Sequence, residues 1–144
     1  MLVSQILKSK ADERVMTVQP HLTVAEAATI LSEKRIGTLI VSRDGTTADG
    51  ILSERDIVRE VGKRGGACLS DTVFTLMTHN PITCRRSDTA DQVLQTMTDG
   101  RFRHLPVVEG GLMVGLISIG DVVKARLSEL AMEKTALEGM IMGN

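Results

Sequence analysis

The chain has 144 residues, of which 42% are hydrophobic and 24% charged, and a formal net charge of −1, which suits one compact unit with a buried core. The balanced charge and the two phenylalanines argue against a general nucleic-acid-binding surface, which needs a basic field and stacking rings. The two cysteines form no C-x-x-C pair, and we find neither an apolar run of about 18 residues nor a signal-peptide apolar region. We therefore expect a reduced, cytoplasmic protein without a membrane span.

The first half predicts a short helix followed by a β-α-β-β-α order. VSQILK at 3–8 is the short helix, which we expect to contact the opposite half of the chain. The β-like segment MTVQP at 16–20 precedes a helix with Thr23 as its cap and apolar residues at helical spacing: Val24, Ala27, Ala28 and Leu31. The β-rich runs TLIV and GILS flank the turn sequence RDGTTAD, and another helix begins directly at Ser53.

The second half repeats this order. PITC at 81–84 is β-like, and the helix after it has Thr89 as its cap and the same apolar spacing: Ala90, Val93, Leu94 and Met97. The runs HLPVV and LMVGLIS flank the turn EGG, and a helix begins at Ser118. An internal repeat of this kind indicates a fold built from two similar units.

Aligning the two halves makes the repeat explicit. Arg35 falls on Arg101, and after a one-residue deletion in the loop GILSERD at 50–56 falls on GLISIGD at 115–121. Units this small bury surface inefficiently alone, so two of them are expected to pack together. We therefore expect an α/β (α+β) fold of two β-α-β-β-α repeats related by pseudo-two-fold symmetry, plus a long C-terminal helix.

The glycine-rich, polar stretch GKRGGACLSD at 62–71 is the expected boundary between the repeats. The division is a first repeat with the N-terminal helix at 1–65, a linker at 66–75, a second repeat at 76–125 and a helical extension at 126–144. In the extension, apolar residues recur at 123, 127, 130, 137 and 141, interrupted by Lys134. Packing on its own domain and contact with a second subunit both account for this stripe, and we favour the second.

The repeated serine and aspartate have two interpretations. A serine at a strand end with an acid three residues later is a capping-box helix start, which needs no ligand. The same helix start presents free N–H groups to a phosphate, with the serine as an added donor, while the aspartate accepts from ribose hydroxyls. The motif alone lacks a countercharge for the phosphate.

Basic residues before one core strand supply that charge. In GRFRHLPVV, Arg101 and Arg103 share one face of an extended segment and His104 adds a further donor. The aligned positions in the first half are Gly37 and Thr38, where only Arg35 and Arg55 are available as cations. We therefore expect two unequal sites, with the site of Ser118 and Asp121 the better one and Arg55 reaching across to it.

The doubled pattern, IGTLIV or RHLPVV followed by G-h-h-S-x-x-D (h, hydrophobic) and an apolar helix, resembles a tandem pair of cystathionine-β-synthase (CBS) domains, a Bateman module, over about residues 1–125. The resemblance is to stand-alone two-domain proteins, which implies a homodimer and a nucleotide groove between the domains. In that groove it implies backbone near Ile82 and Thr83 at the adenine, Asp121 at the ribose, and Ser118 with the basic cluster at phosphates. The first-half counterparts that we assign to nucleotide binding are Val18, Gly37, Ser53, Arg55 and Asp56.

The functional expectation is a non-catalytic adenine-nucleotide sensor, with AMP as the first candidate ligand and ADP, ATP or NAD(H) as alternatives. The other hypothesis is a dimeric protein-interaction module, such as a regulator of a thioredoxin or of an enzyme, with a vestigial groove. Ser118, His104 and Asp121 suggest a catalytic triad, but the serine lies outside a G-x-S-x-G elbow, so we expect no enzyme. Scattered histidines predict no metal site, and no catalytic cofactor, nucleic acid or membrane partner is expected.

Overall fold

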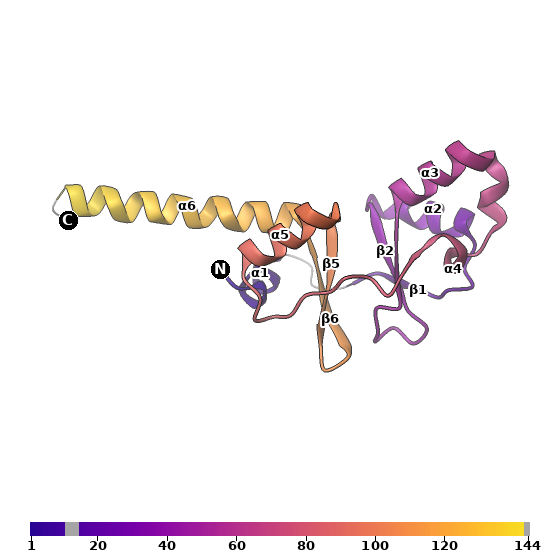
Figure 1. The fold of residues 1–144 in the computed structure, drawn as a ribbon, viewed down its shortest axis with the longest axis horizontal. Helices are drawn as coiled ribbons and strands as arrows, with labels where there is room; N and C mark the ends of the chain where they lie inside the picture. Colours follow the sequence, from indigo (N-terminus) through magenta and orange to yellow (C-terminus); the bar gives the residue numbers. More distant parts are fainter. Residues whose placement is uncertain (11–14, 143–144) are drawn as a thin grey trace.

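The computed structural model describes residues 1–10 and 15–142, and its order of elements contains the expected repeat (Figure 1). The first part of the chain forms α1 (Val3–Ser9), β1 (Thr17–Val18), α2 (Val24–Lys34), β2 (Thr38–Val41), β3 (Gly50–Ser53) and α3 (Glu54–Arg64). A 3₁₀ helix η1 (Gly65–Ser70), α4 (Val73–Leu76) and β4 (Thr78–His79) follow. The second part forms α5 (Ala90–Gly100), β5 (His104–Glu109), β6 (Leu112–Ser118) and α6 (Ile119–Ile141).

Each repeat is built on an antiparallel pair of strands. In the first, β2 pairs with β3 so that Thr38 lies opposite Ser53, and β1 lies parallel to β2. In the second, β5 pairs with β6 so that His104 lies opposite Ser118. The strand expected at 81–84 is reduced to one parallel bridge from Cys84 to β5. The protein is thus a mixed α/β fold of two β-α-β-β-α repeats with pseudo-two-fold symmetry.

Local chemistry explains why the helices begin and end at equivalent residues. Thr23, Ser53, Thr89 and Ser118 each accept a hydrogen bond from the backbone N–H three residues on, within a capping box. The helices α2 and α5 end at Arg35 and Arg101, both in the left-handed conformation, with φ of 54° and 58°. The predicted caps are therefore confirmed, and the repeat extends to backbone conformation.

Two hydrophobic cores form, and each is completed by a helix from before the other repeat. The core of the second repeat includes Val3 and Ile6 of α1, so the expected contact of this helix with the opposite half is confirmed. The core of the first repeat includes Val73 of α4. Equivalent backbone bonds hold the two helices: Val3 N–H donates to Asp88 O at 2.9 Å, and Val73 N–H to Leu22 O at 2.7 Å.

This exchange changes the interpretation of the expected linker. Residues 65–70 form the 3₁₀ helix η1, in which Cys68 is fully buried, and Val73 belongs to the first core. The glycine-rich segment is therefore folded against the first repeat, although its composition suggests a connection. No helix in residues 1–10 or 15–142 is long and apolar enough to cross a membrane.

The exchanged helices also explain the glycine of the repeated motif. A Cβ atom added to Gly50 would lie 2.3 Å from Sδ of Met77, the residue that follows α4. A Cβ atom added to Gly115 would lie 3.0 Å from both terminal methyl carbons of Leu7 in α1. The glycine in each repeat thus provides the room into which a side chain from the exchanged segment fits.

Candidate functional site

The two repeats meet at a hydrogen bond between the first residues of equivalent strands. Thr38 Oγ1 lies 3.0 Å from Nδ1 of His104, and these side chains begin β2 and β5. Two clefts lie at this bridge, and Gly37, Thr38 and His104 line both of them. We call them the Ser118 cleft, of about 800 Å³, and the Ser53 cleft, of about 360 Å³, after the serine that lines each.

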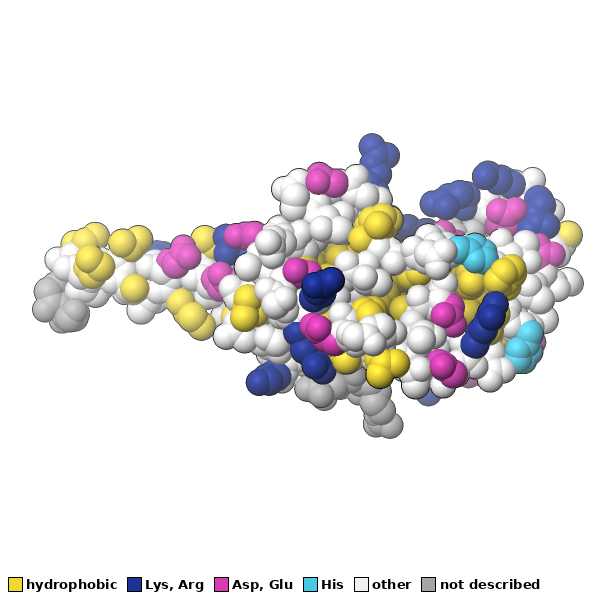
Figure 2. Space-filling view, turned by 60° about the horizontal axis from the view of Figure 1, so that its bottom comes forward, with side chains coloured by type: hydrophobic (Ala, Val, Ile, Leu, Met, Phe, Trp, Pro, Cys, Tyr) yellow, Lys and Arg dark blue, Asp and Glu magenta, His cyan; other side chains and the backbone are white. Residues whose placement is uncertain are grey.

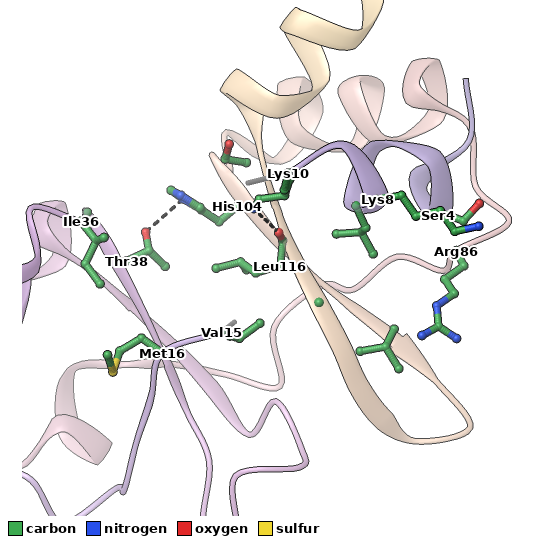
Figure 3. Close-up of a pocket in the computed structure, with 15 residues that line it drawn as sticks. Ser4, Lys8, Lys10, Val15, Met16, Ile36, Thr38, Arg86, His104 and Leu116 are labelled. Carbon is green, nitrogen blue, oxygen red and sulfur yellow. Dashed lines mark hydrogen bonds between the residues drawn. The ribbon is translucent and has the colours of Figure 1, made fainter. Parts of the chain in front are cut away.

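The Ser118 cleft is walled by both repeats and by α1 (Figure 3). Met16 and Ile36 contribute apolar surface from the first repeat, and Leu116 contributes it from β6. Among the residues that the structure describes, the cationic side chains at this cleft are Lys8, Lys10 and Arg86. Its volume and mixed lining suit a ligand with an apolar ring and an anionic group.

The helix start beside this cleft forms several hydrogen bonds within the protein. Ser118 Oγ accepts the Asp121 N–H at 3.1 Å, and Asp121 Oδ2 accepts the Ser118 N–H at 2.9 Å. Lys10 Nζ lies 3.0 Å from the same carboxylate oxygen and donates to Leu116 O at 2.9 Å. Burial raises the pKa of Asp121, but these bonds outweigh burial and its net pKa is lowered. Asp121 lines a separate hollow together with Lys124. Of Ser118 and Asp121, therefore, Ser118 alone lines the Ser118 cleft.

The Ser53 cleft combines an equivalent helix start with a different set of charges. Asp56 Oδ2 accepts the backbone N–H and the hydroxyl of Ser53 at 2.8 and 3.0 Å. Its other oxygen, Oδ1, lies 3.4 Å from Arg59 Nη1. Unlike Asp121, Asp56 lines the cleft of its own serine, together with four arginines: Arg55, Arg59, Arg101 and Arg103.

Arg101 and Arg103 line the Ser53 cleft and not the Ser118 cleft, so the structure does not pair them with Ser118 and Asp121 as expected. The arginines precede β5, and the structure places them across the boundary between repeats, in the cleft of Ser53. Arg55 likewise lies in the Ser53 cleft beside its own serine. The two arginines lie there because the repeats pack so that the turn before β5 faces the first repeat.

Of the other residues assigned to nucleotide binding, some lie at the clefts and some do not. Gly37 and His104 lie at both clefts, as the bridge requires. Val18 is in the first core, while Ile82 and Thr83 are exposed, and these three are outside the described lining of both clefts.

Sequence reasoning missed the cations Lys8, Lys10, Arg59 and Arg86. A signal for the first two exists, because VSQIL at 3–7 matches VFTLM at 73–77 in its apolar positions. Since α1 was already expected to contact the second repeat, these two lysines could have been assigned to the cleft there.

Both helix starts confirm the capping interpretation of the serine and aspartate. The first amide of each helix is also bonded, from Glu54 N–H to Gly37 O at 2.9 Å and from Ile119 N–H to Arg103 O at 2.8 Å. A phosphate beside these helices would thus depend mainly on side-chain cations. Its binding there stays a prediction.

His104 is held as a neutral imidazole at the centre of the site. Burial lowers the pKa of His104 below 6.5, the negative charge of Asp121 opposes this, and the positive charges of Lys10 and Arg103 reinforce it. Its Nδ1 bonds to Thr38 and not to Asp121, so the side chains do not form a Ser-His-Asp triad. In the part of the chain that the structure describes, no cluster of three or more His, Cys, Asp or Glu side chains could hold a metal ion.

Comparison with known proteins identifies the repeated unit. The sequence model of the CBS domain matches residues 3–63 and 72–128. The mitochondrial CBS-domain-containing protein CBSX3 of Arabidopsis thaliana is 33% identical over 148 residues, covering 98% of this chain and 72% of that protein.

Solved structures agree with this match. The CBS-domain-containing protein ATU1752 from Agrobacterium tumefaciens superposes with a TM-score of 0.83 at 43% identity, over 88% of this chain and 99% of that one. The CBS domain protein PAE2072 from Pyrobaculum aerophilum, solved in complex with AMP, has a TM-score of 0.77 at 29% identity, over 92% of this chain and 99% of that one. The chain therefore belongs to the CBS domain family and carries two copies of the domain.

Proposed function

We propose that this protein is a non-catalytic regulatory module that binds an adenine nucleotide and acts as a homodimer. The observation that carries the proposal is the Ser53 cleft, where four arginines from both repeats surround the helix start of Ser53 and Asp56. Because the arginines come from both repeats, a ligand held by them contacts both. If the ligand binds one arrangement of the two repeats more tightly than another, it shifts the protein toward that arrangement. The size of the shift equals the difference in binding free energy between the two arrangements.

The charges of the Ser53 cleft, where four arginines outnumber the carboxylates of Asp56 and Glu54, support a phosphorylated ligand. Guanidinium groups form paired hydrogen bonds to phosphate oxygens, and Arg101 and Arg103 are the two donors contributed by the second repeat. The carboxylate of Asp56 lines the same cleft, and we assign it to accept hydrogen bonds from the ribose hydroxyls. AMP is the first candidate, and the complex of the Pyrobaculum relative with AMP supports it. ADP, ATP and NAD(H) carry the same adenosine and added phosphates, and the Ser118 cleft is a second, weaker position.

Calorimetry and thermal unfolding with AMP, ADP, ATP, NAD, NADH, S-adenosylmethionine, GTP and adenosine test the proposal. A bound nucleotide at a hundredfold excess over Kd should raise the free energy of unfolding by about 2.7 kcal/mol. Arg103→Ala should weaken AMP binding about tenfold or more and leave adenosine nearly unchanged, because it removes a phosphate contact alone. Arg43→Ala is the matched control, since Arg43 is exposed in a loop away from both clefts.

Two results would count against the proposal. Equal losses for AMP and adenosine in Arg103→Ala would place this arginine outside the phosphate position. No stabilisation by any nucleotide would leave the dimeric protein-interaction module, which acts through its surface and not its clefts, as the better account.

A further inference from the structure

The helix α6 carries an apolar stripe that the rest of the chain does not cover. Val123, Leu127, Leu130, Leu137 and Ile141 have exposed fractions between 43% and 84%. Figure 2 shows hydrophobic side chains recurring along this projecting helix. The match to the CBS domain ends at residue 128, so most of the stripe lies beyond the conserved domain.

The stripe is separate from the face that α6 presents to its own domain. Val122 and Ala125 are the buried residues of the helix, and Arg126 pairs with Asp91 of α5 at 2.9 Å. At about 100° per residue, the stripe is centred roughly a quarter turn away from these side chains. Its members alternate in steps of four and three, the spacing of a coiled-coil seam with Lys134 at one core position.

We propose that this stripe binds the same stripe of a second copy of the chain, with the two α6 helices antiparallel. The arrangement deepens the homodimer of the proposed function by fixing its orientation and register. Its core layers pair Val123 with Ile141, Leu127 with Leu137, and Leu130 with Lys134 of the second copy. In this register each Lys134 packs its methylene groups on a leucine and extends its ammonium group to solvent.

Charge on the flank of the stripe selects the antiparallel orientation. Lys124 and Glu138 are both exposed and lie on the same side of the seam. The antiparallel register brings Lys124 of each copy beside Glu138 of the other, at both ends of the pair. Its single like-charge contact is Glu133 against its own copy at the centre.

The parallel orientation is less favourable both in its core layers and in its flanking charges. It would place the two Lys134 side chains in one core layer and bring Glu133 of each copy beside Glu138 of the other. It would also leave Lys124 without an acidic partner across the seam. Like charges across a helix pair disfavour the orientation that brings them together.

Solution mass and site-directed disulfides test the dimer and its orientation separately. The full-length protein should have about twice the 15.6 kDa chain mass by light scattering or sedimentation. Mixing Lys124→Cys protein with Glu138→Cys protein under oxidation should form a disulfide between the two, whereas neither variant should cross-link to itself. The native Cys68 and Cys84 are buried and do not compete.

Charge and stripe variants provide the matched controls. Lys124→Glu should raise the dimer dissociation constant about tenfold at low salt, and adding Glu138→Lys should restore it. Leu130→Glu should give a monomer with unchanged thermal unfolding of the domains, because Leu130 is half-exposed. Thr135→Glu, on the exposed helix surface away from the seam, should remain a dimer.

The outcomes separate this inference from the proposed function. A monomer at high micromolar concentration would overturn both the homodimer and its orientation. A dimer in which Lys124→Cys and Glu138→Cys form no disulfide with each other would overturn the antiparallel register alone. A dimer that Leu130→Glu does not dissociate would place the interface on other helices and leave nucleotide binding untouched.

Discussion

At the scale of the single residue, His104 links the repeats, and its protonation is coupled to folding. Its Nδ1 bonds to Thr38 across the boundary, and burial lowers its pKa below 6.5. The unfolded chain therefore binds a proton that the folded protein does not, at pH values between the lowered pKa and about 6.5. The stability due to neutral His104 is fully present above that window and is lost as the pH falls through it.

The substitution His104→Gln tests this account of the bridge. An amide keeps a hydrogen-bonding group near Thr38 but has no proton to gain, so the free energy of unfolding should change less between pH 7 and pH 5 than in the unchanged protein. Urea unfolding at a series of pH values measures the difference. His79→Gln is the control, because His79 is exposed and lies away from both clefts. If both variants keep the full slope, carboxylates and not His104 determine it.

At the scale of the element, the exchange of α1 and α4 between the repeats makes a testable claim about which half each helix stabilises. Ile6 is nearly fully buried, in a core otherwise built from α5, β5, β6 and α6. Ile6→Ala should lower the free energy of unfolding by about 2–5 kcal/mol, since it leaves a cavity there. Hydrogen exchange should accelerate in α5, β5 and β6 before it does in α2 and β2.

The control for this prediction lies on the same helix. Lys8 of α1 is exposed, so Lys8→Ala should change stability by no more than about 0.5 kcal/mol. Faster hydrogen exchange in α2 and β2 after Ile6→Ala would show that α1 supports the repeat that follows it in sequence. The proposed packing of α1 on the second repeat would then be refuted.

The elements themselves could be predicted because their signals are local. Caps such as Thr23 and Ser118, helical apolar spacing and strand runs depend on neighbours within a few residues. The contact of α1 with the second repeat was expected, but the contact of α4 with the first was not, because the glycines at 65–66 indicate a connection and only tertiary contacts reveal that Cys68 and Val73 are buried. A local sequence signal predicts that a helix forms, but the core on which that helix packs depends on tertiary contacts.

The candidate site shows the same limit more sharply. The sequence predicts the residue types, and Ser53, Asp56, Arg101, Arg103 and His104 all lie at the junction of the repeats. It does not predict which serine the arginines face, because that depends on the crossing of two halves. Lys10, the cation that pairs with Asp121, comes from a segment that the repeat alignment did not include.

At the scale of the whole molecule, approximate symmetry makes two matched carboxylates with different surroundings. Asp56 and Asp121 cap equivalent helices, and their side chains have similar exposed fractions of 19% and 23%. Asp56 lines a cleft with four arginines, whereas Asp121 is bonded to Lys10 and faces away from the Ser118 cleft. The repeat thus supplies a comparison within one chain, in which the structural role is shared and the proposed binding role is not.

Alanine at each position separates the two roles. Both Asp56→Ala and Asp121→Ala remove a capping-box carboxylate and should each cost about 1 kcal/mol of stability, measured by urea unfolding. Only Asp56→Ala should also lose a ribose interaction of about 1.5–3 kcal/mol, which is a tenfold or greater rise in the Kd for AMP by calorimetry. If Asp121→Ala weakens AMP binding more than Asp56→Ala does, the Ser118 cleft is the principal site. The ribose hydroxyls would then donate to Oδ1 of Asp121, because Oδ2 already accepts from the Ser118 N–H and from Lys10 Nζ.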